Sequence, residues 1–289
     1  MDSTLSNTTL SDKLLAAINH DVSLAMEEDI GNGDVTAQLI PVQKSVTATI
    51  ISRESAVICG IPWVERCFQW MAANTSTSIH IQWHVAEGNH IRPDQVLCSL
   101  NGNARAILSA ERCALNFLQT LSATATATRR YVDAIADTSA HIFDTRKTLP
   151  GLRLAQKYAV TIGGGMNQRL GLYDGILIKE NHIAAAGSIE AVLQNAHGLS
   201  TKVSIQIEVE SLPQLEAAIQ AGAGLILLDN FNLQELRDAV KINAGRAVLE
   251  ASGGIDISNV REIALTGVDR ISIGSLTKNI SAIDLSMRF

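Results

Sequence analysis

Apolar residues near the start of the chain recur at helical spacing over residues 12–29. Their stripe predicts an amphipathic helix, and Gly31 stands where such a helix usually ends. The members of the stripe are Leu14, Leu15, Ile18, Val22 and Ala25. We expect this helix to bury one face against a core.

Short runs that alternate or stay apolar follow, separated by turn sequences such as EGN and RPD. They predict an N-terminal α+β, sandwich-like domain over residues 1–115, and we expect the tail 277–289 to pack back on it. The predicted strands cover residues 45–53, 56–60, 78–85 and 95–100, with a helix over 62–72.

Residues 104–138 contain neither Gly nor Pro and predict a long helix that leads into a second domain, residues 116–276. Six apolar runs alternate there with helical stretches, which predicts parallel βα units. These runs are 141–144, 175–179, 203–209, 225–229, 247–251 and 270–275. Six strands are fewer than the eight of a complete barrel, so we expect an open α/β barrel. The alternative is a doubly wound sheet, but GGGMNQR does not match its usual glycine fingerprint.

Nearly every predicted strand of the second domain ends at polar or small residues. Because the carboxyl ends of parallel strands form one face, we expect these residues to share a site. They are Asp144 with Arg146 and Lys147, then Lys179, Glu208, Asp229, Glu250 with Ser252, and Gly274 with Ser275. The first group lies in DTRKTLPG, where a guanidinium and an ammonium side by side suit a polyanionic ligand.

The overall charge restricts the class of partner. A net charge of −6 argues against binding to nucleic acid or to an anionic membrane, so an anion must meet a local basic cluster. Between Asp144 and Lys179 that cluster is Arg146, Lys147, Arg153, Lys157, Arg169 and Lys179. No apolar run approaches the ~20 residues of a membrane span, and Asp2 stands where a signal peptide needs positive charge, which indicates a soluble, cytoplasmic protein.

The cysteines and histidines give only weak evidence for a metal site. The four cysteines show no metal-ligand spacing and are interpreted as reduced packing residues. His80 and His84 share a strand face, but ordinary alternation explains them adequately.

Several long blocks occur in one order along nearly the whole chain. They are EEDIGNGDVTAQLI, ERCALNFLQTLS, DTRKTLPGLR, KYAVTIGGGMNQRLGLYDGILIKENHI, IEVE, LLDNF, ASGG and SIGSLTK. In these blocks the chain resembles the quinolinate phosphoribosyltransferase family. The resemblance implies an incomplete α/β barrel beside an N-terminal sandwich-like domain, and a homodimer whose active site borrows residues from the neighbouring subunit.

The same resemblance implies a pentosyltransferase of NAD biosynthesis. Such an enzyme transfers ribose 5-phosphate from phosphoribosyl pyrophosphate to the ring nitrogen of quinolinate with Mg²⁺. Loss of the adjacent carboxylate then gives nicotinate mononucleotide, pyrophosphate and CO₂.

The matching positions imply site residues. Arg146, Arg169 and the partner's Arg112 resemble the clamp on the quinolinate carboxylates. Lys147 and Lys179 resemble the catalytic lysines, and Glu208 with Asp229 the catalytic and magnesium-binding acids. Thr145, Gln168 and Ile273 belong to the same substrate-binding stretches. The residues that resemble the 5-phosphate cradle are Ser252, Gly253, Gly254, Gly274, Ser275 and Lys278.

Elementary chemistry agrees with these roles. Breaking the bond from ribose to pyrophosphate develops cationic character on the sugar and negative charge on the leaving group. Hard carboxylate oxygens suit Mg²⁺. Decarboxylation needs little acid–base help, because the quaternised ring nitrogen stabilises the carbanion, so the enzyme mainly positions its substrates.

Gln168 departs from the family pattern, which has His before the Arg that follows the triple glycine. A neutral amide cannot carry positive charge, which predicts weaker quinolinate binding or a binding optimum less sensitive to pH near neutrality.

Alternatives remain at single residues and for the function. Lys179 could be a surface residue, Glu208 an ordinary strand residue, and Asp229 the N-cap of the following helix. His182 could be a pocket residue or a structural one. The competing functions are a related phosphoribosyltransferase that uses nicotinate or another acceptor, a Schiff-base aldolase with Lys179 as nucleophile, and a non-catalytic binder of phosphoribosyl ligands.

Overall fold

The computed structural model describes residues 10–200 and 202–289. Most of the amino-terminal stretch on which the signal-peptide interpretation depends lies outside them. The chain divides into two compact units. The first contains residues up to Ala127 with Leu149–Gly163 and Asn279–Phe289, and the second contains Thr128–Thr148 with Gly164–Lys278.

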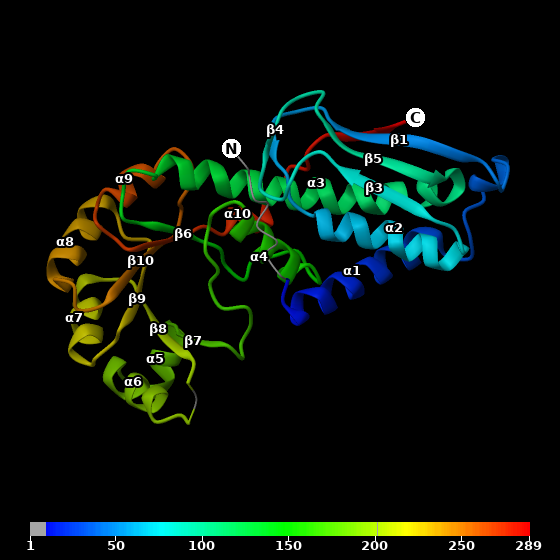
Figure 1. Cartoon of the computed structure of the whole chain (residues 1–289). Helices are drawn as coiled ribbons and strands as arrows, with labels where there is room; N and C mark the ends of the chain where they lie inside the picture. Colours follow the sequence, from blue (N-terminus) through cyan, green and yellow to red (C-terminus); the bar gives the residue numbers. More distant parts are fainter. Residues whose placement is uncertain (1–9, 201) are drawn as a thin grey trace. The chain divides into compact units, whose positions relative to one another are not determined.

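The first unit is a four-stranded antiparallel sheet with helices (Figure 1). The sheet has the order β12-β1-β5-β3, and β2 pairs separately with β4. Its helices are α1 (Asp12–Ile30), the short η1 (Ala37–Leu39), α2 (Ile61–Thr75), the first part of α3 (Ala104–Ala134) and α4 (Arg153–Ile162). Its strands are β1 (Ser45–Ser52), β2 (Ala56–Val57), β3 (Ile79–Trp83), β4 (His90–Ile91), β5 (Val96–Asn103) and β12 (Leu285–Arg288).

The ends of α1 follow from local chemistry. The Ser11 hydroxyl accepts a hydrogen bond from the backbone N–H of Leu14 at 3.3 Å, and Gly31 ends the helix with a φ of 51°. Its inner face buries Ile18, Val22 and Met26 in the core of the first unit. The predicted helix and its capping glycine are both confirmed.

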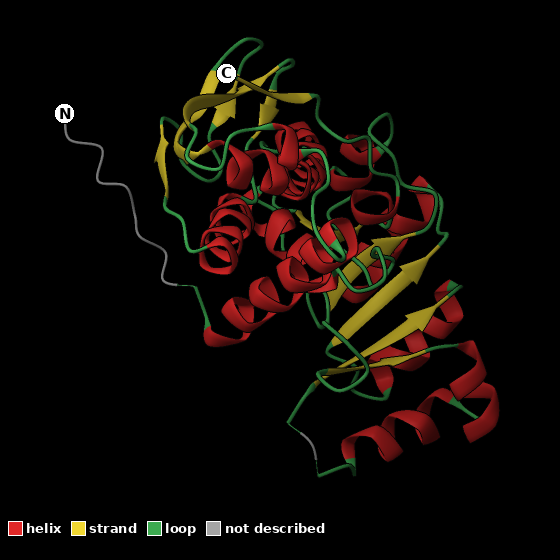
Figure 2. Cartoon of the chain, turned by 90° about the vertical axis from the view of Figure 1, so that its right-hand side faces the viewer, coloured by secondary structure: helices red, strands yellow, loops and turns green. Residues whose placement is uncertain are grey.

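The second unit is built on six parallel strands that lie side by side (Figure 2). Their order is β6-β11-β10-β9-β8-β7. The strands are β6 (His141–Phe143), β7 (Gly175–Ile178), β8 (Ser204–Val209), β9 (Leu225–Asp229), β10 (Val248–Ser252) and β11 (Arg270–Ser272). The helices between them are α5 (Glu180–Ala186), α6 (Ile189–His197), α7 (Leu212–Gln220), α8 (Leu233–Asn243), α9 (Val260–Ala264) and α10 (Ser275–Lys278).

Strands β6 and β7 form the two edges of this sheet, and among the described residues no strand pairing joins them. The predicted open α/β architecture with six parallel strands is therefore confirmed. Helices α6, α7 and α8 pack against the strands through Leu193, Leu215 and Leu236. Figure 1 shows α7 and α8 along one side of the strands. The opposite side chains of the strands remain available for a site.

The two units divide the chain differently from a boundary at residue 115. That position lies inside α3, which runs unbroken through it because the segment lacks Gly and Pro. Helix α4 belongs to the first unit, where the Tyr158 ring lies 5.5 Å from that of Trp63. Strand β12 pairs antiparallel with β1, with Ser52 opposite Leu285.

Two remaining features are the apolar character of the helices and the state of the cysteines. None of the described helices combines the length and the apolar character needed to cross a bilayer. Cys59, Cys67, Cys98 and Cys113 are buried free thiols.

Candidate active site

A cavity of about 320 Å³ lies in the second unit at the carboxyl ends of its strands, within the size range of small-ligand sites. Many of the residues singled out in the sequence line it, although they come from distant parts of the chain. They are Thr145, Arg146, Lys147, Gln168, Arg169, Lys179, Glu208, Asp229 and Ser252. The cavity also includes Leu177, Gln206, Leu227, Glu250 and Ser272.

One wall of the cavity is cationic. Burial and the neighbouring charge of Arg146 lower the pKa of the Arg169 guanidinium, which still stays charged at neutral pH. Arg169 donates from Nη1 to the carbonyl oxygen of Gly175 at 3.0 Å. The Asp174 carboxylate shapes the intervening loop, because it accepts from the backbone of Leu170 at 2.7 Å and of Gly171 at 2.8 Å. Two guanidinium groups held near each other favour an anionic ligand.

A second wall pairs a lysine with an acid. Lys179 follows β7, and its Nζ lies 2.9 and 2.7 Å from the two carboxylate oxygens of Glu208 on β8. The Lys179 side chain is 43% exposed and that of Glu208 is 10% exposed. Lys179 thus presents a positive charge to the cavity and is not a free surface residue.

His182 has a structural role. Its Nδ1 accepts from the backbone N–H of Lys179 at 3.1 Å, which satisfies a donor at the start of α5. It is not among the residues that line the cavity.

Asp229 ends β9 and faces the same cavity. Burial raises the pKa of its carboxyl, and the charge of Lys179 opposes that rise. The described residues contain no cluster of three or more His, Cys, Asp or Glu arranged around a metal position. Glu208 and Asp229 nevertheless fit Mg²⁺, which takes one or two carboxylates together with water and substrate phosphates.

The predicted phosphate cradle has close backbone packing. Gly253 has a φ of 95°, and a Cβ there would lie 2.1 Å from Oδ1 of Asn230. A Cβ on Gly274 would lie 3.0 Å from Cδ of Lys147, so the missing side chain lets that lysine lie against the turn after β11. The buried Ser275 hydroxyl has no hydrogen-bond partner within the described residues.

Several predicted positions lie outside the residues that line the cavity. Of the predicted phosphate cradle only Ser252 lines it, and Gly253, Gly254, Gly274 and Ser275 do not. Ile273 is 1% exposed and its backbone N–H bonds to the Phe143 carbonyl at 2.9 Å, so its side chain belongs to the core and not to a substrate contact. Lys278 is exposed at the end of α10. Arg112 is exposed on α3 in the first unit.

Two important cavity residues were not among the predicted substrate contacts, although Glu250 was one of the strand-end residues expected to share a site. Glu250 is completely buried in β10, and both of its oxygens accept from Nε2 of Gln168 at 2.6 Å. Gln206 on β8 donates to the same carboxylate at 3.0 Å. Burial raises the pKa of Glu250, and these hydrogen bonds oppose the rise. The available signal was polar alternation in strands that are otherwise apolar.

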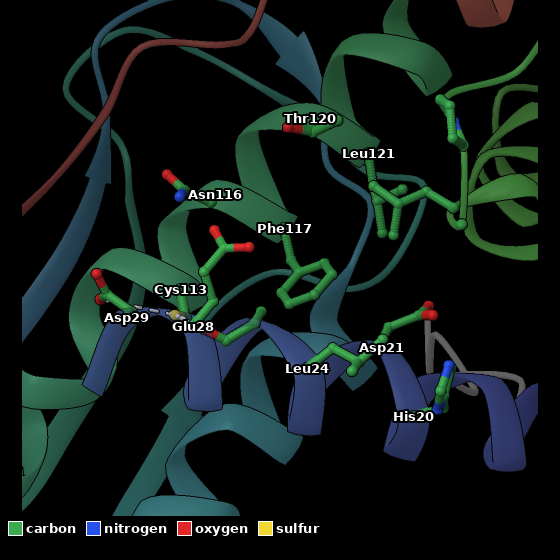
Figure 3. Close-up of a pocket in the computed structure, with 14 residues that line it drawn as sticks. His20, Asp21, Leu24, Glu28, Asp29, Cys113, Asn116, Phe117, Thr120 and Leu121 are labelled. Carbon is green, nitrogen blue, oxygen red and sulfur yellow. Dashed lines mark hydrogen bonds between the residues drawn. The ribbon is translucent and has the colours of Figure 1, made fainter. Parts of the chain in front are cut away.

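A separate cavity of about 400 Å³ lies in the first unit between α1 and α3 (Figure 3). Phe117 and Leu121 from α3 face Leu24 and Asp21 from α1 there. Burial and the nearby Asp29 raise the pKa of the Cys113 thiol to about 11, so this thiol stays protonated at neutral pH. None of the predicted site residues lines this cavity.

Comparison with known proteins places this geometry in context. Residues 34–122 match the model of the quinolinate phosphoribosyl transferase N-terminal domain, and residues 124–288 match that of the C-terminal domain. A probable nicotinate-nucleotide pyrophosphorylase [carboxylating] from Bacillus subtilis is 41% identical over 261 residues, which cover 90% of this chain and 89% of the relative. The Mycobacterium leprae enzyme of that name is 38% identical over 283 residues, or 96% of this chain and 99% of the relative.

Solved structures agree with the sequence matches. The nicotinate-nucleotide pyrophosphorylase from Francisella tularensis superposes with a TM-score of 0.91 at 42% identity, covering 94% of this chain and 96% of that one. Both family domains and the full fold are thus present, and the chain belongs to the quinolinate phosphoribosyl transferase family.

Proposed function

We propose that this protein transfers the phosphoribosyl group of phosphoribosyl pyrophosphate to quinolinate with loss of CO₂, forming nicotinate mononucleotide and pyrophosphate. The observation that carries the proposal is one cavity that unites Arg146 and Arg169 with the Lys179–Glu208 pair and Asp229. Its charges match an aromatic dicarboxylate beside a phosphorylated sugar. Relatives named for this activity match nearly the whole chain.

The guanidinium wall binds and orients the acceptor. Quinolinate carries two carboxylates on adjacent ring carbons, and Arg146 with Arg169 offers planar donors for such groups. A fixed ring directs its nitrogen at the anomeric carbon, so that the encounter of two substrates becomes a reaction between positioned groups. Lys147, whose backbone N–H bonds to the Thr145 hydroxyl at 3.1 Å, extends the positive wall toward the turn at Gly274.

The acids face the developing sugar cation. Glu208 and Asp229 place negative charge where the ribose becomes oxocarbenium-like, while Lys179 and Lys147 favour the departing pyrophosphate. Nζ of Lys179 is engaged by both Glu208 oxygens, which disfavours a role as a Schiff-base nucleophile. The unpartnered Ser275 hydroxyl and the close-packed Gly253 turn offer donors for the 5-phosphate.

Mg²⁺ belongs to this proposal. Glu208 and Asp229 would hold it together with substrate oxygens, and the ion would neutralise charge on the pyrophosphate.

A homodimer belongs to the proposal as well. Arg112 is exposed on α3 of the first unit, and Leu172, which follows the Arg169 loop in the second unit, is 75% exposed. Tyr173 beside it is 69% exposed, and a second copy would cover this pair of apolar side chains while it delivers Arg112. The four free thiols suit a reducing compartment, and we propose a cytoplasmic location.

The test is an assay of nicotinate mononucleotide and CO₂ formed from quinolinate and phosphoribosyl pyrophosphate, with and without Mg²⁺. Nicotinate serves as the parallel acceptor. We expect Mg²⁺-dependent turnover with quinolinate only. The Glu208→Gln variant keeps the side-chain shape but removes the charge and should lose at least 100-fold in kcat. Turnover with nicotinate alone would indicate the related transferase, and tight binding of phosphoribosyl pyrophosphate without turnover would indicate a non-catalytic binder.

A further inference from the structure

Three side chains from distant segments of the chain, Gln168, Gln206 and Glu250, meet in a largely buried polar cluster that lines the same cavity. Glu250 is 0% exposed and Gln206 is 4% exposed, so the carboxylate and the amide have little contact with solvent. Nε2 of Gln168 lies 2.6 Å from each Glu250 oxygen and 3.3 Å from Oε1 of Gln206. Gln206 in turn donates from its own Nε2 to Glu250 at 3.0 Å.

The orientation of the Gln168 amide follows from these contacts. An amide nitrogen has two hydrogens, and three acceptor oxygens already surround it. The opposite orientation would bring the carbonyl oxygen to 2.6 Å from a carboxylate, where two acceptors repel each other. The donor capacity of Gln168 is therefore directed into the protein and not toward a carboxylate in the cavity.

Such a cluster costs more desolvation free energy than apolar side chains of the same size would. A carboxylate in a buried position loses its hydration, and the hydrogen bonds that Gln168 and Gln206 donate to Glu250 come from neutral amides. Its neighbours on β10, Leu249 and Ala251, supply the core packing of that strand. The position of Glu250 thus calls for a role beyond packing.

The cluster fixes the backbone that carries Arg169. The side chain of Gln168 is held by Glu250, and its backbone N–H donates to Oδ1 of Asp144 at 2.8 Å. Arg169 is the next residue, and its guanidinium lines the cavity beside Arg146. Anchoring Gln168 at both its backbone and its side chain restricts where the Arg169 backbone can lie.

We propose that Glu250 and Gln206 are positioning residues that act through Gln168 to hold Arg169 in register for the acceptor dicarboxylate. This inference rests on the proposed function, because it assigns the quinolinate side of the cavity to Arg169. The cluster determines acceptor binding and leaves the phosphoribosyl donor side unaffected. Gln168 serves as the link in the cluster and makes no direct substrate contact.

The experiment compares Glu250→Leu, which removes the acceptors at similar size, with Glu250→Gln, which keeps one carbonyl acceptor. For Glu250→Leu we expect KM for quinolinate to rise at least tenfold, with KM for phosphoribosyl pyrophosphate unchanged within twofold. Glu250→Gln should recover most of the loss and stay within threefold of the unmodified protein. A Gln168→Ala, Glu250→Leu double variant should be no worse than the poorer single variant, because both substitutions break one unit.

Two further variants separate positioning from general stability. Gln206→Leu removes one donor to Glu250 and leaves the contact between Gln168 and Glu250, so it should raise the same KM three- to tenfold. This variant keeps the inference testable if Glu250→Leu fails to fold. Asn243→Ala is the matched control, since Asn243 is also a buried polar residue of this unit but bonds to Ala247 instead. It should lower the melting temperature and leave both KM values unchanged. A cluster with a merely structural role would make Gln206→Leu behave like Asn243→Ala, which would overturn the proposal.

Binding without turnover distinguishes this inference from the proposed function. Quinolinate alone should raise the melting temperature of the unmodified protein and of Glu250→Gln. It should raise that of Gln206→Leu by a smaller amount and leave that of Glu250→Leu unchanged. Binding without product formation would reject the proposed reaction while the variants still support positioning. Absence of both binding and turnover in the unmodified protein would reject both. Additive effects in the double variant, or equal rises in both KM values, would reject positioning alone.

Discussion

At the scale of single residues, two adjacent glycines in the turn after β10 differ in what surrounds them. Both have positive φ, 95° at Gly253 and 59° at Gly254. A Cβ on Gly253 would lie 2.1 Å from Oδ1 and 2.9 Å from the backbone nitrogen of Asn230, whereas a Cβ on Gly254 meets nothing within 4 Å. The Asn230 side chain can rotate away, but its backbone nitrogen cannot.

Alanine at these positions should therefore have different effects. Gly254→Ala should cost about 1 kcal/mol of stability, the usual penalty of a left-handed alanine. Gly253→Ala adds a clash that displaces the turn, and we expect a loss of about 2–4 kcal/mol. Its KM for phosphoribosyl pyrophosphate should rise at least tenfold, against less than threefold for Gly254→Ala. Equal KM values in the two variants would contradict a phosphate role for this turn.

Glu87 supports a prediction about pH in the first unit. Its carboxylate accepts from the backbone of Gly60 at 2.8 Å and of Ile61 at 3.1 Å, at the start of α2. Burial raises the pKa of Glu87, and these two bonds only partly oppose the rise. A raised pKa means that the folded state binds the proton more tightly than the unfolded state. The associated stability is complete below a pH of about 4.3 and is lost as pH rises through the folded pKa.

Glu87→Gln removes this titration. The free energy of unfolding of the unmodified protein, relative to the variant, should fall between pH 4 and pH 7. Urea unfolding followed by tryptophan fluorescence measures it in the first unit, because Trp63, Trp70 and Trp83 all lie there. If the unfolding free energy of the unmodified protein relative to Glu87→Gln instead rises with pH, the hydrogen bonds to Glu87 lower its pKa by more than burial raises it.

At the scale of elements, the start of α8 leaves Asp229 available to the cavity. The N-cap is Asn232, whose Oδ1 accepts from the backbone of Gln234 at 2.9 Å and of Glu235 at 3.0 Å. The Glu235 carboxylate accepts from the backbone N–H of Asn232 at 2.8 Å and completes a capping box. The alternative interpretation of Asp229 as the helix cap is therefore wrong.

Removing this cap should affect stability and not catalysis. Asn232→Ala should lower the free energy of unfolding by about 1 kcal/mol, while Asn232→Asp should keep it. Thermal melting followed by circular dichroism compares the two. Both variants should retain KM and kcat within twofold, since β9 and not α8 holds Asp229. A tenfold loss of kcat in Asn232→Ala would show that the cap sets the position of the acid.

Strand β8 illustrates how much of the site the sequence could predict. Alternation in SIQIEV predicts that Gln206 and Glu208 share a face, and the strand end together with the family resemblance identifies Glu208. Nothing local distinguishes Gln206, because its role depends on Gln168 and Glu250 from other segments. The strands and their polar ends were thus predictable from periodicity. The buried cluster arises only from tertiary packing.

At the scale of the whole molecule, the periodicity of apolar residues could not predict which chain segments belong to which unit. Helix α4 follows β6 in the manner of a βα unit, yet it belongs to the first unit, where Tyr158 packs near Trp63. Residues 277–289 were expected to pack back on the N-terminal domain, but the pairing of β12 with β1 at the edge of the antiparallel sheet was not part of that prediction. Both outcomes depend on contacts between residues far apart in sequence.

Arg112 leads to a prediction about assembly. The cavity of the second unit does not include Arg112, and the proposed homodimer supplies it from the partner subunit. Arg112→Ala and Lys147→Ala should each be inactive as homodimers. In a mixed dimer, one site combines the intact Lys147 of one chain with the intact Arg112 of the other, while the second site carries both substitutions.

Coexpression of the two variants in equal amounts should therefore restore activity. Random pairing makes about half of the dimers mixed, and each mixed dimer has one intact site out of two, so about a quarter of full activity should return. The measurement is kcat per site of the coexpressed pool, compared with each parent and with dimers purified through two different tags. If Arg112 acted within its own chain, no pairing of chains could create an intact site. If it had no role, the Arg112→Ala variant would be active by itself. In both cases the pool would show only the mean of its parents.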